Sequence, residues 1–177
     1  MLLRFTRLDE RRYETVITRS DGVTYHVKGV GHMSSLPHDL AHFAVEQGLR
    51  ITGGFWGSVA DGAVFGSLTH VSGRRKPHAA ERSNAVLKAN RDELTATEIL
   101  VGLFNQALEE GLGPESPELR DRLRRYIWTP PRQRPRKFTD AEIGAVCSGW
   151  KRMLDLWREM AVGDTAELAW PEIRKSG

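Results

Sequence analysis

Several features that mark other protein classes are scarce or missing in this sequence. Cys147 is the only cysteine, so the chain cannot form an internal disulfide, which suits a reducing cytoplasm. No stretch approaches the roughly 18 uninterrupted apolar residues that a membrane-spanning helix requires. Residues 1–7 mix arginines with apolar residues and lack the continuous apolar run of a signal peptide. We therefore expect a cytoplasmic protein with no membrane-spanning segment.

The excess of positive charge is small in total but concentrated in one region. The net charge is +3, whereas residues 71–137 alone carry 14 Lys/Arg against 9 Asp/Glu, a net +5. Within this region, residues 128–137 hold three prolines and alternating arginines, which predicts an extended linker. Such a region could bind nucleic acid or an acidic partner, or it could be a solvated connector. No recognised nucleic-acid-binding motif accompanies it.

The pattern of strand and helix signals predicts one α+β domain spanning residues 1–177. Hydrophobic residues at 40% and charged residues at 28% are ordinary proportions for a soluble globular chain. Residues 2–8, 12–19 and 23–30 are rich in β-formers, and Ser20-Asp21-Gly22 supplies a hairpin turn. Residues 1–30 should therefore form an antiparallel meander, joined at its edge by a strand at 164–170. About five helices should cover mainly one face of this sheet.

Capping signals and apolar periodicity place the helices. Pro37 opens a helix over residues 35–49 that closes near Gly48. Two capping boxes, Thr95 to Glu98 and Thr139 to Glu142, each predict the start of a helix. The other predicted helices are a short one at 56–60, one at 79–90 and one at 117–127. Residues 63–71 allow either a short strand or an irregular segment, and Gly53-Gly54 predicts a tight turn.

The helix at 35–49 carries the only polar cluster that suggests chemistry. At about 100° per residue, His38, His42, Glu46 and Asp39 fall within one arc of roughly 100°, and apolar residues fill most of the rest. Because residues four apart on a helix are neighbours, the two histidines can direct two imidazole nitrogens at one ion. This spacing predicts a metal site, and imidazole ligands favour zinc, although they also suit nickel, copper and iron.

The string from His38 to His42 resembles the His-Glu-x-x-His helix of zinc hydrolases, with Asp39 in place of the general base. An aspartate is one methylene shorter, so Asp39 is a weak candidate base that could instead orient a ligand. Glu46 is the candidate for a further ligand beside His42. The remaining ligand could come from one of three other histidines, His32, His70 or His78. A metal-dependent hydrolase acting on an unidentified small molecule or peptide follows as the first hypothesis.

Two other interpretations of these residues remain open. A buried histidine can simply form hydrogen bonds and help to pack a core, with no metal involved. Alternatively, His38-Asp39 could be the metal-binding dipeptide of HD-type phosphohydrolases. Those enzymes are all-helical before the dipeptide, whereas a hairpin precedes it here, so we rank this interpretation lower. A non-enzymatic binding protein that uses residues 71–137 is the alternative from a different class.

Three segments together resemble a family of small bacterial proteins. They are the opening Leu3-Arg4-Phe5-Thr6-Arg7 with Glu10-Arg11-Arg12-Tyr13, the centre Leu36-Pro37-His38-Asp39-Leu40-Ala41-His42-Phe43-Ala44-Val45-Glu46, and the ending from Val162-Gly163 to Trp170-Pro171. The central segment is the specific part, and the three segments span most of the chain. The resemblance implies a bacterial cytoplasmic protein and supplies neither an activity nor a ligand.

Overall fold

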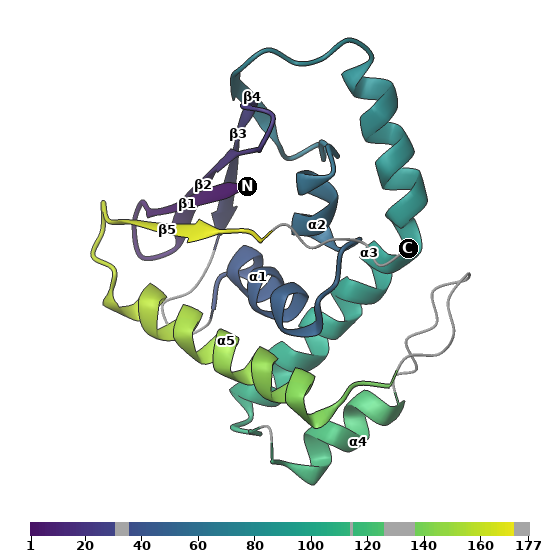
Figure 1. Cartoon of the computed structure of the whole chain (residues 1–177). Helices are drawn as coiled ribbons and strands as arrows, with labels where there is room; N and C mark the ends of the chain where they lie inside the picture. The colour runs from purple at the N-terminus through teal and green to yellow at the C-terminus, as the bar shows by residue number, and fades with distance from the viewer. Residues whose placement is uncertain (31–35, 114, 126–136, 172–177) are drawn as a thin grey trace.

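The computed structural model describes residues 1–30, 36–113, 115–125 and 137–171 (Figure 1). This part of the chain forms one antiparallel sheet and a set of helices, which confirms the predicted α+β class. The strands are β1 (Leu2–Arg7), β2 (Arg12–Thr18), β3 (Thr24–Val30), β4 (Thr69–Ser72) and β5 (Thr165–Ala169). The helices are α1 (His38–Leu49), α2 (Phe55–Ala60), α3 (Ala79–Glu109), α4 (Pro117–Arg125) and α5 (Asp140–Glu159).

The sheet has the strand order β4-β3-β2-β1-β5. The first three strands form the predicted meander, and β5 pairs antiparallel with β1, so that Phe5 lies between Thr15 and Ala166. Along β1, β2 and β3, buried side chains alternate with more exposed ones. The buried side chains share one face of the sheet: Leu3, Phe5, Arg7, Tyr13, Thr15, Ile17, Tyr25 and Val27. This alternation with period two is what a sheet covered on one face requires.

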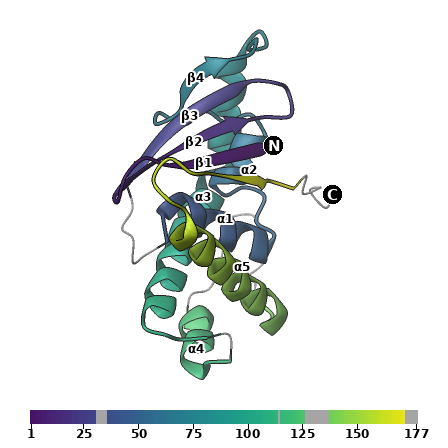
Figure 2. The same cartoon turned by 90° about the vertical axis from the view of Figure 1, so that its left-hand side faces the viewer.

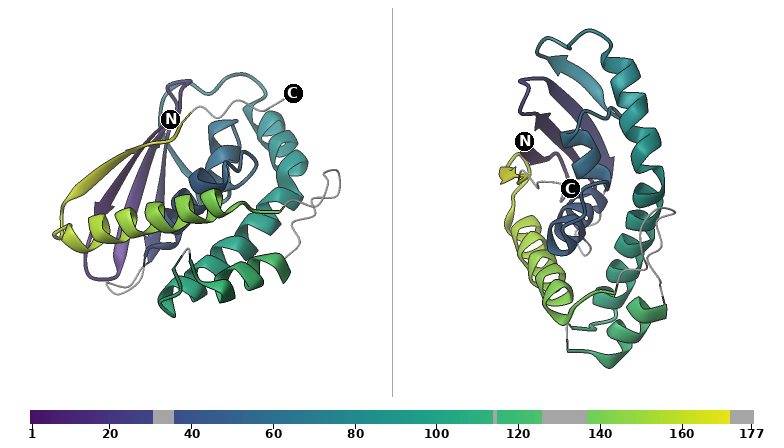
Figure 3. Two further views of the ribbon diagram at one scale, coloured as in Figure 1. Left: turned by 60° about the horizontal axis from the view of Figure 1, so that its bottom comes forward. Right: turned by 45° about the vertical axis from the view of Figure 1, so that its right-hand side comes forward.

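The helices pack against that single face of the sheet (Figure 2). Aromatic pairs join the two layers: Phe5 meets Trp56 of α2 edge-on, and Tyr13 meets Trp157 of α5 in the same way. Helix α1 lies between α5 and α3 (Figure 3). At the α1–α5 crossing, a Cβ on Gly48 would lie 2.6 Å from Cγ2 of Val146, so the glycine permits this close approach. None of the helices in the described ranges is long and apolar enough to cross a membrane.

Helix α5 begins and ends as elementary capping rules require. At its start, Thr139 and Glu142 form the predicted capping box, with each side chain bonded to the other residue's backbone N–H. At its end, the buried Arg7 donates from Nη1 to the carbonyl of Met160 at 2.6 Å, and its guanidinium lies over the Trp157 ring. A cation at a helix C-terminus is favoured by the helix dipole. Trp150 and Trp157 are both buried, as their seven-residue spacing predicts.

The predicted break between residues 90 and 95 is wrong, because α3 is one helix from Ala79 to Glu109 (Figure 1). Thr95 and Thr97 do not cap a helix start. Their hydroxyls donate to the carbonyls of Arg91 and Glu93, four residues earlier, which is how these residues fit inside a helix. The Glu98 carboxylate, expected in a capping box, contacts His38 and His42 instead.

Other differences are at element ends. Residues 69–72 form the edge strand β4, which settles the choice left open for residues 63–71. The predicted helix at 117–127 is described only as far as Arg125, where Leu119 and Leu123 are its buried residues. Residues 126–136 lie outside the described residues, and these include nearly all of the predicted linker.

Candidate metal centre

The first turns of α1 set the positions of its two histidines. Pro37 is the N-cap residue and its side chain makes no capping hydrogen bond, and His38 is the first residue of the helix. His42 lies one turn further, where α1 is enclosed by the rest of the molecule, and its side chain is 3% exposed against 60% for His38. The four-residue spacing places the two rings edge to face, with centroids 4.7 Å apart.

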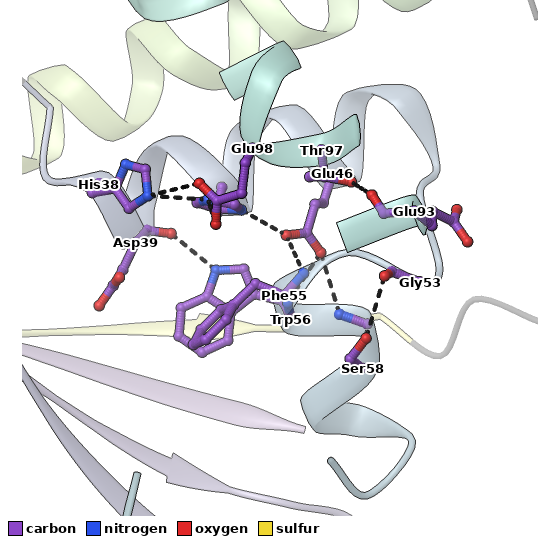
Figure 4. A network of polar contacts seen from close by, with 12 residues as sticks. His38, Asp39, Glu46, Gly53, Phe55, Trp56, Ser58, Glu93, Thr97 and Glu98 are labelled. Carbon is purple, nitrogen blue, oxygen red and sulfur yellow. Dashed lines mark hydrogen bonds and ion pairs between the residues drawn. The ribbon is translucent and has the colours of Figure 1, made fainter. Parts of the chain in front are cut away.

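A carboxylate from a different helix completes this cluster (Figure 4). Glu98 of α3 lies with one oxygen 3.3 Å from Nε2 of His38 and the other 3.3 Å from Nε2 of His42. The two Nε2 atoms are themselves 3.2 Å apart. One ligand atom from each of the three residues lies within 4.8 Å of the others. His38, His42 and Glu98 are therefore close enough to bind a single metal ion.

Glu46 lies on the other side of His42, where it is completely buried. Its Oε1 atom is 3.0 Å from Nδ1 of His42 and accepts a hydrogen bond from the backbone N–H of Phe55 at 2.9 Å. Its Oε2 atom accepts from the backbone N–H groups of Trp56 and Gly57 at 3.0 and 3.3 Å. These donors form the first turn of α2, where free N–H groups and the helix dipole favour a negative charge.

This arrangement determines which nitrogen of His42 can bind an ion. A proton on Nδ1 is held by the Glu46 carboxylate, which leaves the lone pair of Nε2 directed at His38 and Glu98. A carboxylate behind a histidine is the usual way in which proteins fix the tautomer and orientation of a metal ligand. Glu46 therefore orients His42 from the side away from the cluster. It does not occupy the ligand position beside His38 and His42 that the sequence suggested for it.

The electrostatics of the cluster favour the charged forms of His42 and Glu98, whereas burial opposes the charged form of Glu46. Burial acts to lower the pKa of His42, but its hydrogen bonds to Glu46 and Glu98 outweigh that effect and raise the pKa to about 9. Hydrogen bonds to His38 and His42 lower the pKa of Glu98 well below its usual range. Burial raises the pKa of Glu46, against the opposing effect of His42 and the α2 backbone N–H groups. An ion that binds at Nε2 must therefore displace a proton from His42.

The two glycines before α2 each lie against a carboxylate, and Gly54 is the one that faces Glu46. A Cβ on Gly54 would lie 2.5 Å from Cδ of Glu46, and a Cβ on Gly53 would lie 2.2 Å from a carboxylate oxygen of Glu93. Any larger residue at either position would displace the carboxylate that it faces. The sequence predicted only a tight turn here, whereas the structure shows that Gly54 provides space for the buried carboxylate of Glu46.

Asp39 is turned away from the cluster (Figure 4). Its carboxyl group forms a hydrogen bond with the phenol of Tyr13 on the sheet, and burial raises the pKa of both groups. Its backbone carbonyl accepts a hydrogen bond from Nε1 of Trp56 at 2.9 Å. Asp39 thus connects α1 by hydrogen bonds to the sheet and to α2. The dipeptide His38-Asp39 does not direct both side chains at one point, as the HD-type interpretation would need.

Two of the other histidines considered as ligands, His70 and His78, lie in the described part of the chain and do not join the cluster. His70 on β4 is exposed and contacts the carbonyl of Gly73, and His78 pairs with Glu81 at the start of α3. His32 lies outside the described residues. Sequence reasoning missed Glu98 because it assigned this residue to the capping box of Thr95, and no local pattern connects a glutamate on α3 to a histidine 56 positions earlier.

No protein-family model matches the chain, no curated protein matches its sequence, and no solved structure matches its fold.

Proposed function

We propose that this protein is a zinc-dependent hydrolase whose ion is bound by His38, His42 and Glu98. The observation that carries the proposal is the convergence of the two Nε2 atoms and the Glu98 carboxylate. The Nε2 atoms lie 3.2 Å apart, Oε2 of Glu98 lies 3.3 Å from Nε2 of His38, and Oε1 of Glu98 lies 3.3 Å from Nε2 of His42. Zn–N bonds of about 2.0–2.1 Å in a tetrahedral site require ligand atoms roughly 3.3–3.4 Å apart. The separation of the two Nε2 atoms is close to this value, and Glu98 offers one carboxylate oxygen at a similar distance from each of them.

The exposure of the ligands supports a catalytic rather than a structural ion. The side chains of His38 and Glu98 are 60% and 55% exposed, whereas His42 is buried. Three protein ligands on one side leave the fourth position to solvent, which is the arrangement of catalytic zinc sites. A zinc ion there would lower the pKa of a bound water to about 7 and so supply a hydroxide nucleophile. The reaction class that follows is hydrolysis.

The side chains have separate roles in this proposal. His42 is the buried ligand whose orientation is fixed, Glu46 holds its Nδ1 proton, and His38 and Glu98 complete the exposed half of the site. We do not assign the general base to Asp39, because its carboxyl group is bonded to Tyr13. Glu98, from α3, takes the position that the sequence suggested for Glu46.

The competing explanation is a purely ionic cluster, in which a protonated His42 bridges Glu46 and Glu98. Elemental analysis of protein purified without a histidine tag separates the two explanations. We expect close to one zinc per chain, and a rise in melting temperature when Zn²⁺ is returned to chelator-treated protein. Neither bound metal nor stabilisation by Zn²⁺, Ni²⁺, Mn²⁺ or Fe²⁺ would leave only the ionic cluster.

Matched variants test whether zinc binds at this site. Glu98→Gln removes one ligand charge, and Asp92→Asn makes the same change in charge at an exposed position on the same helix. We expect Glu98→Gln and His38→Ala to lose zinc and the stabilisation that it brings, while Asp92→Asn retains both. If all three variants bind zinc like wild type, the ion is held somewhere else.

Activity is tested with three chromogenic substrate classes, a p-nitrophenyl ester, a bis-p-nitrophenyl phosphodiester and a p-nitroanilide. We expect hydrolysis of at least one class that requires zinc, disappears in Glu98→Gln and persists in Asp92→Asn. A protein that holds zinc at this site but hydrolyses none of these classes would contradict the hydrolase assignment and preserve the metal site.

A further inference from the structure

We propose that a second site, remote from the metal centre, binds the phosphoryl group of a small molecule. The site is a cavity of about 250 Å³ between the β2–β3 turn, the segment after α2 and the start of α3. Cationic side chains from three separate segments line it: Arg19, Arg75, Lys76 and Arg82. Among the described residues, the carboxylates that line the cavity with them are those of Asp21 and Asp61. Cations gathered in a concave site attract an anion that offsets their mutual repulsion.

Arg19 lines this cavity, and its side chain is held in place by its neighbours. Its Nε and Nη2 atoms both bond to the Asp21 carboxylate, and its guanidinium lies 5.5 Å from the centre of the Tyr25 ring. The hydrogen bond from Arg19 lowers the pKa of Asp21, so the Asp21 carboxylate stays ionised. The Nη1 atom of Arg19 is buried and has no hydrogen-bond partner among the described residues. A buried guanidinium N–H with no acceptor is costly, and an anion close by would offset that cost.

The start of α3 adds a second source of positive potential. Ala79, its first residue, lines the cavity, and the N-cap residue His78 is in the left-handed conformation with no side-chain cap. The first backbone N–H groups of a helix have no partner within the helix, and the dipole of a helix 31 residues long adds positive potential there. Helix N-termini lined by basic residues are a common way of binding phosphate.

The chemistry of these groups selects the ligand class. Guanidinium and ammonium donors together with backbone N–H groups suit a phosphoryl dianion, because its oxygens accept several charge-assisted hydrogen bonds at once. The enclosed volume suits a small phosphorylated molecule. Ala79 and Glu98 are 19 residues apart on one helix, which is about 28 Å along the axis. The cavity is therefore independent of the metal centre.

Binding is measured by calorimetry with inorganic phosphate, pyrophosphate and a nucleoside monophosphate, at constant ionic strength and with chelator present. We expect saturable binding of at least one of these, with an increase in melting temperature that sodium chloride does not reproduce. Arg19→Gln should weaken binding at least about tenfold, the usual effect of losing a charge-assisted hydrogen bond. Because Arg19 also supports the β2–β3 turn, the exposed double variant Arg75→Gln/Lys76→Gln provides a second test and should weaken binding similarly.

The matched control is Arg74→Gln/Lys88→Gln, which removes two positive charges from exposed positions outside the cavity. This control should bind phosphate like wild type. If both double variants lost phosphate affinity equally, net charge alone would attract the anion, which would contradict a built site. Absence of saturable phosphate binding to the wild-type protein would overturn the proposal. Binding of single-stranded DNA that phosphate cannot compete away would overturn the small-molecule proposal. Glu98→Gln should leave phosphate binding unchanged, so failure here is distinguishable from failure of the zinc proposal.

Discussion

The carboxylate of Glu46 lies 3.0 Å from Nδ1 of His42, on the side of the imidazole opposite to His38 and Glu98. The same carboxylate is anchored by backbone N–H groups of the first turn of α2. One buried side chain thus fixes both the position of α2 and the tautomer of His42. The geometry of the metal centre is consequently coupled to the packing of α1 against α2.

The variant Glu46→Gln tests this coupling. A glutamine amide can accept from the α2 backbone, but its NH₂ group would then face Nδ1 of His42 and favour the tautomer with the proton on Nε2. We expect zinc affinity to fall about 10–100-fold, the usual effect of losing such an outer partner. Chelator competition measures the affinity, and ¹⁵N chemical shifts of the imidazole report the tautomer. Unchanged affinity together with an unchanged tautomer would show that Glu46 has only a structural role.

Zinc affinity should depend on pH through His42. Its pKa in the folded protein, about 9, lies above the usual value of 6.5. The stabilisation that the protonated ring gives to the metal-free fold is therefore complete below pH 6.5 and is lost as pH rises towards 9. Zinc needs the deprotonated Nε2 atom, so its affinity should rise about tenfold per pH unit across this window. Competition titrations at pH 6.5, 7.5 and 8.5 measure this, and a constant affinity would contradict it.

Of the residues of α5, Trp157 should be the one whose substitution by alanine lowers the free energy of unfolding most. It is fully buried, its ring packs edge-on against Tyr13, and the Arg7 guanidinium lies 5.1 Å from the ring centre. Trp157→Ala should cost about 3–5 kcal/mol of unfolding free energy, because a large cavity would remain. The indole Nε1 atom has no hydrogen-bond partner in the part of the chain that the structure describes, so Trp157→Phe should cost much less unfolding free energy. Urea denaturation of both variants measures the difference, and equal losses would refute this packing argument.

Removing β5 should destabilise the whole sheet. The strand pairs with β1 over residues 165–169, and the buried Trp170 that follows it packs edge-on against Phe43 of α1. A chain that ends at Gly163 would expose the β1 edge and lose these contacts. We expect a lower melting temperature and a greater tendency to aggregate, measured by circular dichroism and light scattering. As a control, Glu167→Gln keeps the strand and removes only an exposed ion pair with Arg4, so it should melt close to wild type. A truncated chain that melts like wild type would show that β5 contributes little.

The fold followed largely from local patterns in the sequence. Alternating β-formers, the turn at Ser20-Asp21-Gly22 and the capping box at Thr139 are local signals, and each describes the structure correctly. The error at Thr95 has a local cause as well. A threonine can either cap a helix or bond back to the carbonyl four residues earlier, and the strong helix formers on both sides of Thr95 favour the second.

The sequence by itself determined the spacing of His38 and His42, since two residues four apart on a helix must share a face. Only the tertiary structure decided what surrounds them. It brought Glu98 from α3 to the exposed side of His42, and it placed Glu46 against the start of α2 on the buried side. The physical reason is that a carboxylate's role depends on the donors that reach it. Those donors come from segments whose approach depends on packing and, for Glu46, on the space left by Gly54.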